Sequence, residues 1–263
     1  MSNGTSASLA IPERMGAALL DIAGQAGGIA IMAGQILRRA MPWKIDRYEF
    51  FRNMYRMGVK SLPILAATAF FVGAIMVIQA APLVVRYNAR SFVGFSAIYT
   101  TFREIGPLLM ALMFNGRVGA NNTAELGTMA VTEQLDALRA LAIDPITYLV
   151  VPRAISIVII LTCLCVIGDF LAIVGAMGMA SFMLDVDWKL FLNSALPKLE
   201  MWDFAVGVIK AFLFGIMIAL NSCYFGLSTD GGAPGVGRAV NRSVVAAASG
   251  VFIADYLSTF ILN

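Results

Sequence analysis

The chain has 263 residues, of which 59% are hydrophobic and 13% are charged, and its mean hydropathy is +0.81. Soluble domains carry about 25% charged residues, so this composition excludes an ordinary soluble globule and indicates a protein embedded in a bilayer. Histidine is absent, which excludes hydrolytic triads and zinc sites of the usual kind. The three cysteines lie in apolar segments and predict no disulfide framework.

The first 60 residues are expected to lie outside the main bundle of spans. Residues 1–12 hold no cation, so they predict a disordered tail and no cleavable signal peptide. Residues 15–37 are apolar but include Asp21, two glutamines and five glycines. They fit either a sixth span or a helix in the membrane interface, and the interfacial helix is preferred. Residues 42–60 interleave cations with aromatic residues, which suits a membrane surface better than an ordinary solvated helix.

Five segments are apolar enough to cross the bilayer, which takes about 20 residues. The first carries no charge, the second holds only an Arg-Glu pair, and each of the other three holds one charged residue. The third is longer than one crossing needs, which predicts a tilted or protruding helix. These predicted spans are residues 61–85, 91–115, 154–184, 204–228 and 243–262.

The positions of Lys and Arg predict the orientation of these spans. Seven cations lie between residues 38 and 60, three between spans two and three, and two between spans four and five. Each of the two opposite loops holds two cations, and in the second of them four carboxylates outnumber the cations. The N-terminal region is therefore expected in the cytoplasm and the C-terminus outside, which fits five spans better than six.

Residues 115–153, between spans two and three, form the longest predicted loop. Asn121, Asn122 and Thr123 offer helix caps. A second helix is predicted from Thr132 to Ala142, with an apolar stripe of Val131, Leu135, Leu138 and Leu141, before Asp144-Pro145 ends it. This segment is interpreted as a docking element, and the alternative is a connector that packs on the protein's own cytoplasmic face.

Arg103 and Glu104 lie near the middle of span two, where charges are costly and often functional. Neighbouring residues point about 100° apart on a helix, so their partners could instead be Lys210 or Asp169. The pair is interpreted either as a polar site for a lipid headgroup or as buried ion pairs that hold the bundle together. Asp169 and Asp255 are expected to be structural or interfacial. Pro107 is expected to kink or loosen the span.

Residues 232–238, GAPGVGR, resemble a phosphate-binding loop only superficially. Arg238 stands where that motif needs Lys, Ala239 stands where it needs Ser or Thr, and no strand is expected before it. The segment therefore predicts a cytoplasmic turn, and any ATP-driven function would need a separate ATPase.

Three ordered blocks resemble the MlaE/YrbE family, the permeases of ABC transporters that work with MCE proteins. They are FREIGPLLMALMFNGR, GRVGANNTAELGTMAVTEQLDALRALAIDPITYLVVPR and GVGRAVNRSVVAAASGVFIADYLSTFIL. The resemblance covers roughly residues 45–263. It implies an all-α membrane protein with an N-terminal interfacial helix, five transmembrane helices and a cytoplasmic coupling helix between spans two and three. The match to the shorter Glu-Ala-Ala motif of other ABC importers is partial, because residues 124–127 read Ala-Glu-Leu-Gly.

The resemblance also implies partners. These are a second copy of the chain, a cytoplasmic ABC ATPase that binds ATP and Mg, a periplasmic MCE-domain protein and a lipid, with no nucleic acid and no cofactor in this chain. The expected location is the bacterial inner membrane. The residues expected to couple to the ATPase are Glu125, Gly127, Glu133, Gln134, Asp136, Ala137, Leu138 and Arg139.

A lipid cavity is expected where two copies of span two and the adjoining part of span one meet. Helical spacing places Tyr99, Phe102, Arg103 and Gly106 on one face of span two, and the small Gly106 would let another helix approach. The full expected lining is Met76, Gln79, Leu83, Tyr99, Phe102, Arg103 and Glu104.

The predicted organisation is an N-terminal tail with interfacial helices (residues 1–60) and a permease domain (61–263) that contains the coupling element (116–145). The predicted function is transport of phospholipid or another hydrophobic molecule between the inner membrane and an MCE channel. The alternatives are a membrane-embedded lipid-modifying enzyme, which the absence of His disfavours, and a non-transporting scaffold, which the docking element and the Arg-Glu pair disfavour.

Overall fold

The computed structural model describes residues 11–40 and 47–262, and this part of the chain is almost entirely helical, with no strand. The predicted N-terminal tail up to residue 10 and the start of the amphipathic segment, 41–46, lie outside the described residues. The α-helices are α1 (Ile11–Ala40), α2 (Arg47–Met54), α3 (Leu62–Arg86), α4 (Val93–Thr100), α5 (Gly106–Phe114), α6 (Ala120–Val131), α7 (Gln134–Ala140), α8 (Val151–Leu184), α9 (Trp188–Ala195), α10 (Met201–Leu227) and α11 (Gly232–Leu262).

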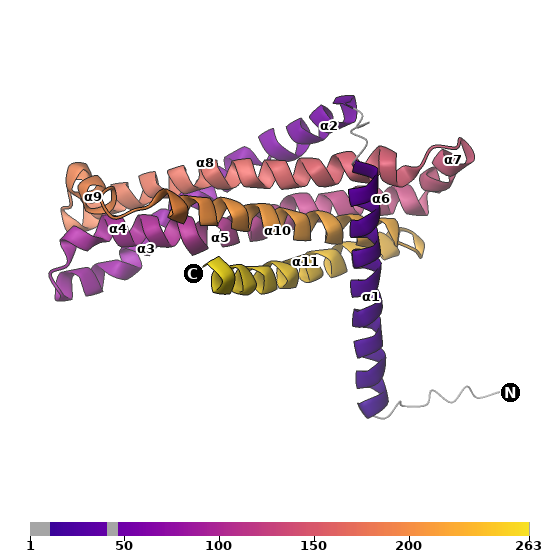
Figure 1. Ribbon diagram of the computed structural model, residues 1–263, viewed down its shortest axis with the longest axis horizontal. Coiled ribbons are helices and arrows are strands. Elements are labelled where there is room, and N and C mark those ends of the chain that lie inside the picture. Colours follow the sequence, from indigo (N-terminus) through magenta and orange to yellow (C-terminus); the bar gives the residue numbers. More distant parts are fainter. Residues whose placement is uncertain (1–10, 41–46, 263) are drawn as a thin grey trace.

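The long helices lie side by side in one elongated bundle, with α9 at one end and α7 at the other (Figure 1). In the described part of the chain, four helices are long and apolar enough to cross a membrane: Tyr48–Arg86, Ile146–Leu184, Met201–Leu227 and Gly232–Leu262. They contain the predicted spans one, three, four and five. The helix that contains predicted span three, Ile146–Leu184, is 39 residues long, about 58 Å at 1.5 Å per residue. It is therefore longer than the hydrocarbon core is thick, as predicted.

The predicted second span is not one of these four helices. It is built from α4, the π-helix η3 (Thr101–Ile105) and α5, and it continues through a second π-helix, η4 (Asn115–Gly119), into α6. The Arg-Glu pair makes this stretch less apolar than its neighbours. The widened turn η3 lies directly before Pro107, which has no N–H to donate. The predicted loosening at Pro107 is therefore a local widening of the helix.

Two glycines allow α3 and α8 to touch along their backbones. A Cβ atom on Gly73 would lie 1.8 Å from the carbonyl oxygen of Ala172, and one on Gly175 would lie 2.0 Å from the carbonyl oxygen of Phe70. Any larger side chain would force the helices apart. Small residues at such contacts are typical of helix packing in membranes, where backbone contact replaces the hydrophobic driving force.

The predicted helix caps at residues 121–123 are wrong. These residues lie inside a continuous helical run, because η4 leads into α6 without a break. Thr123 donates a hydrogen bond to Ser243 (2.8 Å), and the Asn122 amide donates to Ser222 (2.9 Å), both in the buried interior. Their short polar side chains join α6 to α10 and α11 and do not start a helix.

Helix α1 crosses the bundle near the end that carries α6 and α7 (Figure 1). It contacts α10, the π-helix η5 (Ile146–Val150) and α8, and Met32 is its buried anchor. Because a sixth span would run along the bundle, this crosswise position favours the interfacial helix over the sixth span.

Candidate functional site

The structure gives Arg103, on η3, partners from three elements. Its guanidinium donates to Asp203 at the start of α10 (3.1 Å) and to the hydroxyl of Tyr99 (3.1 Å). It also lies over the Tyr99 ring, 5.3 Å from the centroid, and reaches the carbonyl oxygen of Leu262 (3.5 Å). Arg103 therefore ties the predicted second span to the N-terminal end of α10 and the C-terminal end of α11.

The side chain of Glu104 points in a different direction from that of Arg103, as the 100° step between neighbouring residues of a helix predicts. Its carboxylate pairs with the ammonium of Lys210 (2.8 Å), which also pairs with Asp255 (3.0 Å) and donates to Thr259 (2.7 Å). Thr259 donates back to Glu104 (3.1 Å). Lys210 is fully buried, while the side chain of Glu104 is 39% exposed. Lys210, Glu104, Asp255 and Thr259 are here called the Lys210 cluster, and the exposed surface of Glu104 is its open edge.

Of the two partners predicted for the Arg-Glu pair, Lys210 is the partner of Glu104, whereas the carboxylate that pairs with Arg103 is Asp203 in place of Asp169. Asp169 is buried on α8, where the Cys165 thiol donates to it (3.8 Å). A Cβ atom on Gly106 would lie 2.0 Å from its carboxylate. Gly106 thus allows the close approach that its size predicts, and the neighbour is Asp169.

Sequence reasoning missed Asp203 and Thr259 as members of this site. Asp203 also accepts a hydrogen bond from the backbone N–H of Glu200 (3.1 Å). The same carboxylate therefore both caps the start of α10 and pairs with Arg103. The capping pattern Glu-x-x-Asp was visible in the sequence, whereas its pairing across 100 residues was not. Thr259 carried no signal beyond its helical spacing from Asp255.

The remaining residues of the expected lipid lining do not all share one face. Met76 accepts a weak hydrogen bond from Thr101 (3.7 Å) and is half-buried, whereas Gln79 and Leu83 are exposed on the outer surface of α3. Phe102 packs edge-on against Phe204 of α10, with ring centroids 5.3 Å apart. The predicted face thus keeps Tyr99 with Arg103, while Phe102 turns into the bundle.

The expected coupling residues divide into an exposed group and an internal group. On and next to α7, the side chains of Glu133, Gln134, Asp136, Ala137 and Arg139 are exposed and Leu138 is half-buried. Asp136 and Arg139 pair with each other at 2.7 Å. The helix begins at Gln134, because Glu133 has a left-handed backbone (φ 59°) and ends the preceding turn. Of the predicted stripe, Leu135 is buried and Leu141 is exposed.

The internal group lies on α6. The Glu125 carboxylate pairs with Arg56 (2.9 Å) and with the buried Arg153 (3.3 Å), and it accepts from Asn121 (2.8 Å). A Cβ atom on Gly127 would lie 2.9 Å from the hydroxyl of Thr229. Both residues hold α6 against its neighbours within this chain. Their part in coupling stays a prediction.

Asp144 connects two helices at the α7 end of the molecule. It accepts hydrogen bonds from the backbone N–H (3.1 Å) and hydroxyl (2.6 Å) of Thr147, and it pairs with Arg39 of α1. Partial burial by itself would raise the pKa of Asp144, but these hydrogen bonds and the Arg39 charge outweigh it and lower the pKa below the ordinary 3.8. Asp144 thus caps the helix that leads into α8 and joins it to α1.

Comparison with known sequences places this arrangement in a family. Residues 50–261 match the model of the family described as Permease MlaE. The chain belongs to the MlaE permease family. It is therefore a multi-pass membrane protein of the ABC transporter permease class.

Individual relatives agree with this assignment. The chain is 41% identical to a probable ABC transporter permease protein of Rickettsia felis, over 79% of this chain and 80% of the relative. It is 36% identical to a probable ABC transporter permease protein of Synechocystis, over 88% of both. It is 34% identical to the chloroplastic protein TRIGALACTOSYLDIACYLGLYCEROL 1 of Arabidopsis thaliana, over 88% of this chain and 67% of the relative.

Proposed function

We propose that this chain is the permease subunit of an ABC transporter that moves phospholipid or another hydrophobic molecule between the inner membrane and an MCE-protein channel, driven by a separate ATPase. The family assignment supports the transporter class. The Arabidopsis relative is named after a galactolipid, which supports a lipid as the transported molecule. The working unit in this proposal is a homodimer with one ATPase bound to each α7.

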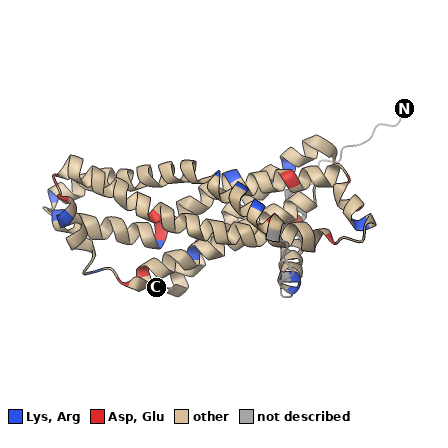
Figure 2. Ribbon diagram, turned by 90° about the horizontal axis from the view of Figure 1, so that it is seen from above, with Lys and Arg blue, Asp and Glu red and all other residues tan. Residues whose placement is uncertain are grey.

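Five helical runs cross the membrane in this proposal, with the α4–η3–α5 run as the second crossing. The α7 end faces the cytoplasm and the α9 end faces outward. The crowding of Lys and Arg toward the α7 end of the bundle supports this orientation (Figure 2).

The observation that carries the lipid proposal is the Lys210 cluster beside Arg103. Charged groups within apolar helices are costly unless they are paired. The members of this cluster pair with one another, and the side chain of Glu104 is still 39% exposed. Tyr99 and Arg103 lie on the same helical run as Glu104. Met76 of α3 contacts Thr101 of that run. In the proposed cavity, acyl chains lie against Met76 and Leu83, and the polar end of the lipid meets Arg103 and Glu104.

Photo-crosslinking tests this proposal. A photoreactive amino acid is placed singly at positions 76, 83, 99 and 102 in the full complex in native membranes, with position 170 on the exposed outer face of α8 as the control. We expect lipid adducts at 76, 83 and 99 that change in yield when ATP is added, while the control captures bulk lipid whether or not ATP is present. ATP-independent adducts, or protein adducts alone at these positions, would contradict a transport cavity here.

A further inference from the structure

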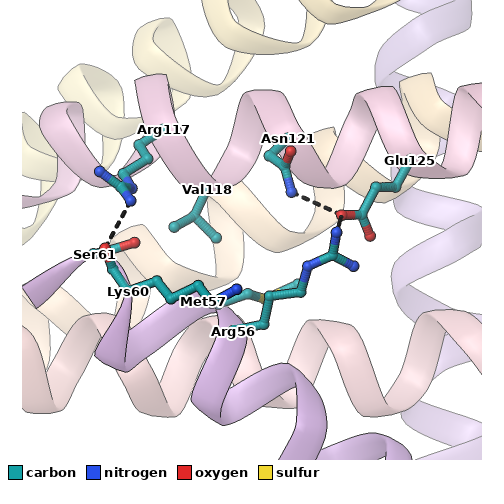
Figure 3. Close-up of a pocket in the computed structure, with 8 residues that line it drawn as sticks. All are labelled: Arg56, Met57, Lys60, Ser61, Arg117, Val118, Asn121 and Glu125. Atoms are coloured by element: carbon teal, nitrogen blue, oxygen red, sulfur yellow. Dashed lines mark hydrogen bonds and ion pairs between the residues drawn. The ribbon is translucent and has the colours of Figure 1, made fainter.

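A pocket of about 240 Å³ opens between the end of the N-terminal helical segment and the start of α6. Figure 3 shows its two walls, one helix that carries Arg117, Asn121 and Glu125 and a facing helix that carries Arg56 and Lys60. The side chains of Met57 and Val118 add apolar surface. A bound water needs only about 10–15 Å³, so this pocket has room for a phosphate group and part of its ester.

The pocket has an excess of positive charge. Three cations line it, Arg56, Lys60 and Arg117, against the single carboxylate of Glu125. That carboxylate is already shared between Arg56 (2.9 Å) and Arg153 (3.3 Å). Lys60 makes no ion pair within the described part of the chain. Among the residues that the structure describes, no carboxylate pairs with Lys60 or Arg117.

Arg117 is oriented by the backbone. Its guanidinium donates to the carbonyl oxygen of Lys60 at 2.6 Å (Figure 3), which holds the Arg117 side chain across the mouth of the pocket. A guanidinium has five N–H donors, so most of them stay available. Arg117 and Lys60 both line the pocket, and a guanidinium and an ammonium are groups that bind a phosphate monoanion.

The pocket lies next to the start of the long uncharged helix α3. Lys60 is two residues before α3, whose first 24 residues carry no charge. Ile64, Phe71 and Ile75 follow Lys60 at helical spacing and are 45%, 62% and 47% exposed. Tyr55, 61% exposed, directly precedes the pocket residue Arg56, and aromatic residues are typical of the headgroup layer. A headgroup in the pocket would thus have an exposed apolar stripe below it for its acyl chain.

We infer that this pocket binds the phosphate group of an anionic phospholipid from the leaflet at the α7 end of the bundle. Basic pockets between membrane helices bind anionic headgroups in this way. The site is separate from the Lys210 cluster, because Arg117 lies 14 residues beyond Arg103 on one helical run, about 20 Å along its axis. It does not depend on what the protein transports.

The test uses the full complex in nanodiscs of phosphatidylcholine with a minor fraction of phosphatidylglycerol, and native mass spectrometry counts the phosphatidylglycerol that stays bound. The variants are Lys60→Gln, Arg117→Gln and the double change, with Arg86→Gln at the opposite end of α3 as the matched control. We expect the double variant to retain phosphatidylglycerol about tenfold more weakly and the control to behave as the parent. Lys60→Arg should keep the binding, since it keeps the charge.

Two results would overturn the inference. One is unchanged retention in the double variant, or an equal loss in Arg86→Gln. The other comes from a second arm, in which inorganic phosphate is added to phosphatidylcholine nanodiscs that contain no anionic lipid. The melting temperature of the complex is measured with phosphate and with phosphatidylglycerol. If phosphate alone raises this temperature as much as phosphatidylglycerol does, and the double variant loses the rise, then the pocket binds free phosphate and not a lipid.

Discussion

Lys210 is the residue on which the centre of the molecule depends most. It has no exposed surface, and a lysine buried in an apolar bundle is stable only because two carboxylates and a hydroxyl surround its ammonium. Three elements meet at this one atom, since Glu104 comes from η3, Lys210 from α10 and Asp255 from α11. The cluster therefore fixes helix positions as well as providing the polar edge proposed for lipid contact.

Replacement of Lys210 by Met should strongly destabilise the protein. The change leaves Glu104 and Asp255 facing each other without a cation, and breaking a buried pair in this way costs about 3–5 kcal/mol. Unfolding in a denaturing detergent series would measure the loss. A triple variant that also carries Glu104→Gln and Asp255→Asn should recover most of it. A Lys210→Met protein as stable as one with the exposed Lys189→Met change would contradict the assigned pairing.

Asp144→Asn should loosen the α7 end at neutral pH. The carboxylate caps a helix start and pairs with Arg39, and losing such a cap costs about 1 kcal/mol. Because the folded pKa of Asp144 is lowered, its stabilisation is complete above the ordinary pKa of 3.8 and is lost as the pH falls through the folded value. Hydrogen exchange at residues 146–150 should therefore be faster in the variant at pH 7 than in the parent. An equal rate at pH 7 would refute the cap.

At the scale of the elements, the second span shows how a polar helix is accommodated in the bundle. The π-helix η3 changes the register by widening one turn, and this places Arg103 toward Asp203 while Glu104 faces Lys210. Widened turns of this kind are frequent at functional sites. Close contacts hold the turn in place, since a Cβ atom on Gly207 of α10 would lie 2.1 Å from the carbonyl oxygen of Phe102.

The contact between α3 and α8 predicts a large difference between two glycines of the same helix. Gly175→Ala would press a methyl group onto the carbonyl oxygen of Phe70, whereas nothing lies within 4 Å of a Cβ atom on Gly178. We expect Gly175→Ala to lose at least about 1–3 kcal/mol through overpacking. Gly178→Ala should be neutral or gain up to about 1 kcal/mol from helix propensity. Thermal unfolding measures both, and equal stabilities would show that the helices do not touch here.

Helix α7 offers a charge swap that keeps its own ion pair. In Asp136→Arg combined with Arg139→Asp, the i,i+3 pair survives with its direction reversed, so the helix should fold while its surface charges are exchanged. We expect the swap to reduce recovery of the ATPase in pull-downs severalfold. Lys189→Glu, at the far end of the bundle, should leave recovery unchanged. Full ATPase recovery with the swap would count against α7 as the docking element.

The whole molecule combines a long bundle with a helix that lies across it (Figure 1). Charged residues gather at the ends of the bundle, and a smaller group lies partway along it (Figure 2). A membrane protein with this distribution can tilt its long axis only slightly in the bilayer if every charge is to stay in water or paired. The crosswise α1 then lies where an interfacial helix belongs, at the boundary of the α7 end.

Cysteine labelling from either side of the membrane should give opposite results at the two ends. In a background without Cys163, Cys165 and Cys223, Ser91→Cys should react with an impermeant reagent added outside, and Ala137→Cys should react only after the membrane is opened. Both positions are exposed. A cysteine at Asn263, outside the described residues, is expected to react from outside. Reaction of Ala137→Cys in intact cells would reverse the proposed topology.

The sequence by itself determined the features that depend on local chemistry. Long apolar segments must be helices in a bilayer, since only a helix satisfies its backbone within one segment, and four of the predicted spans are such helices. The family followed from ordered blocks of residues, and the family model confirmed it. A helix before Asp144-Pro145 also followed from residue type, but α7 is Gln134–Ala140, shorter than the predicted Thr132 to Ala142.

The tertiary structure alone decided which distant residues meet. Asn122 and Thr123 suit a helix cap, but buried partners on α10 and α11 made a continuous helix more favourable there. Asp203 lies 100 residues from Arg103, and no local pattern encodes that pairing. The widening at η3 and the excess charge around Lys60 likewise depend on neighbouring helices. Pairing, register and local charge balance are properties of packed elements, so they were fixed only when the bundle formed.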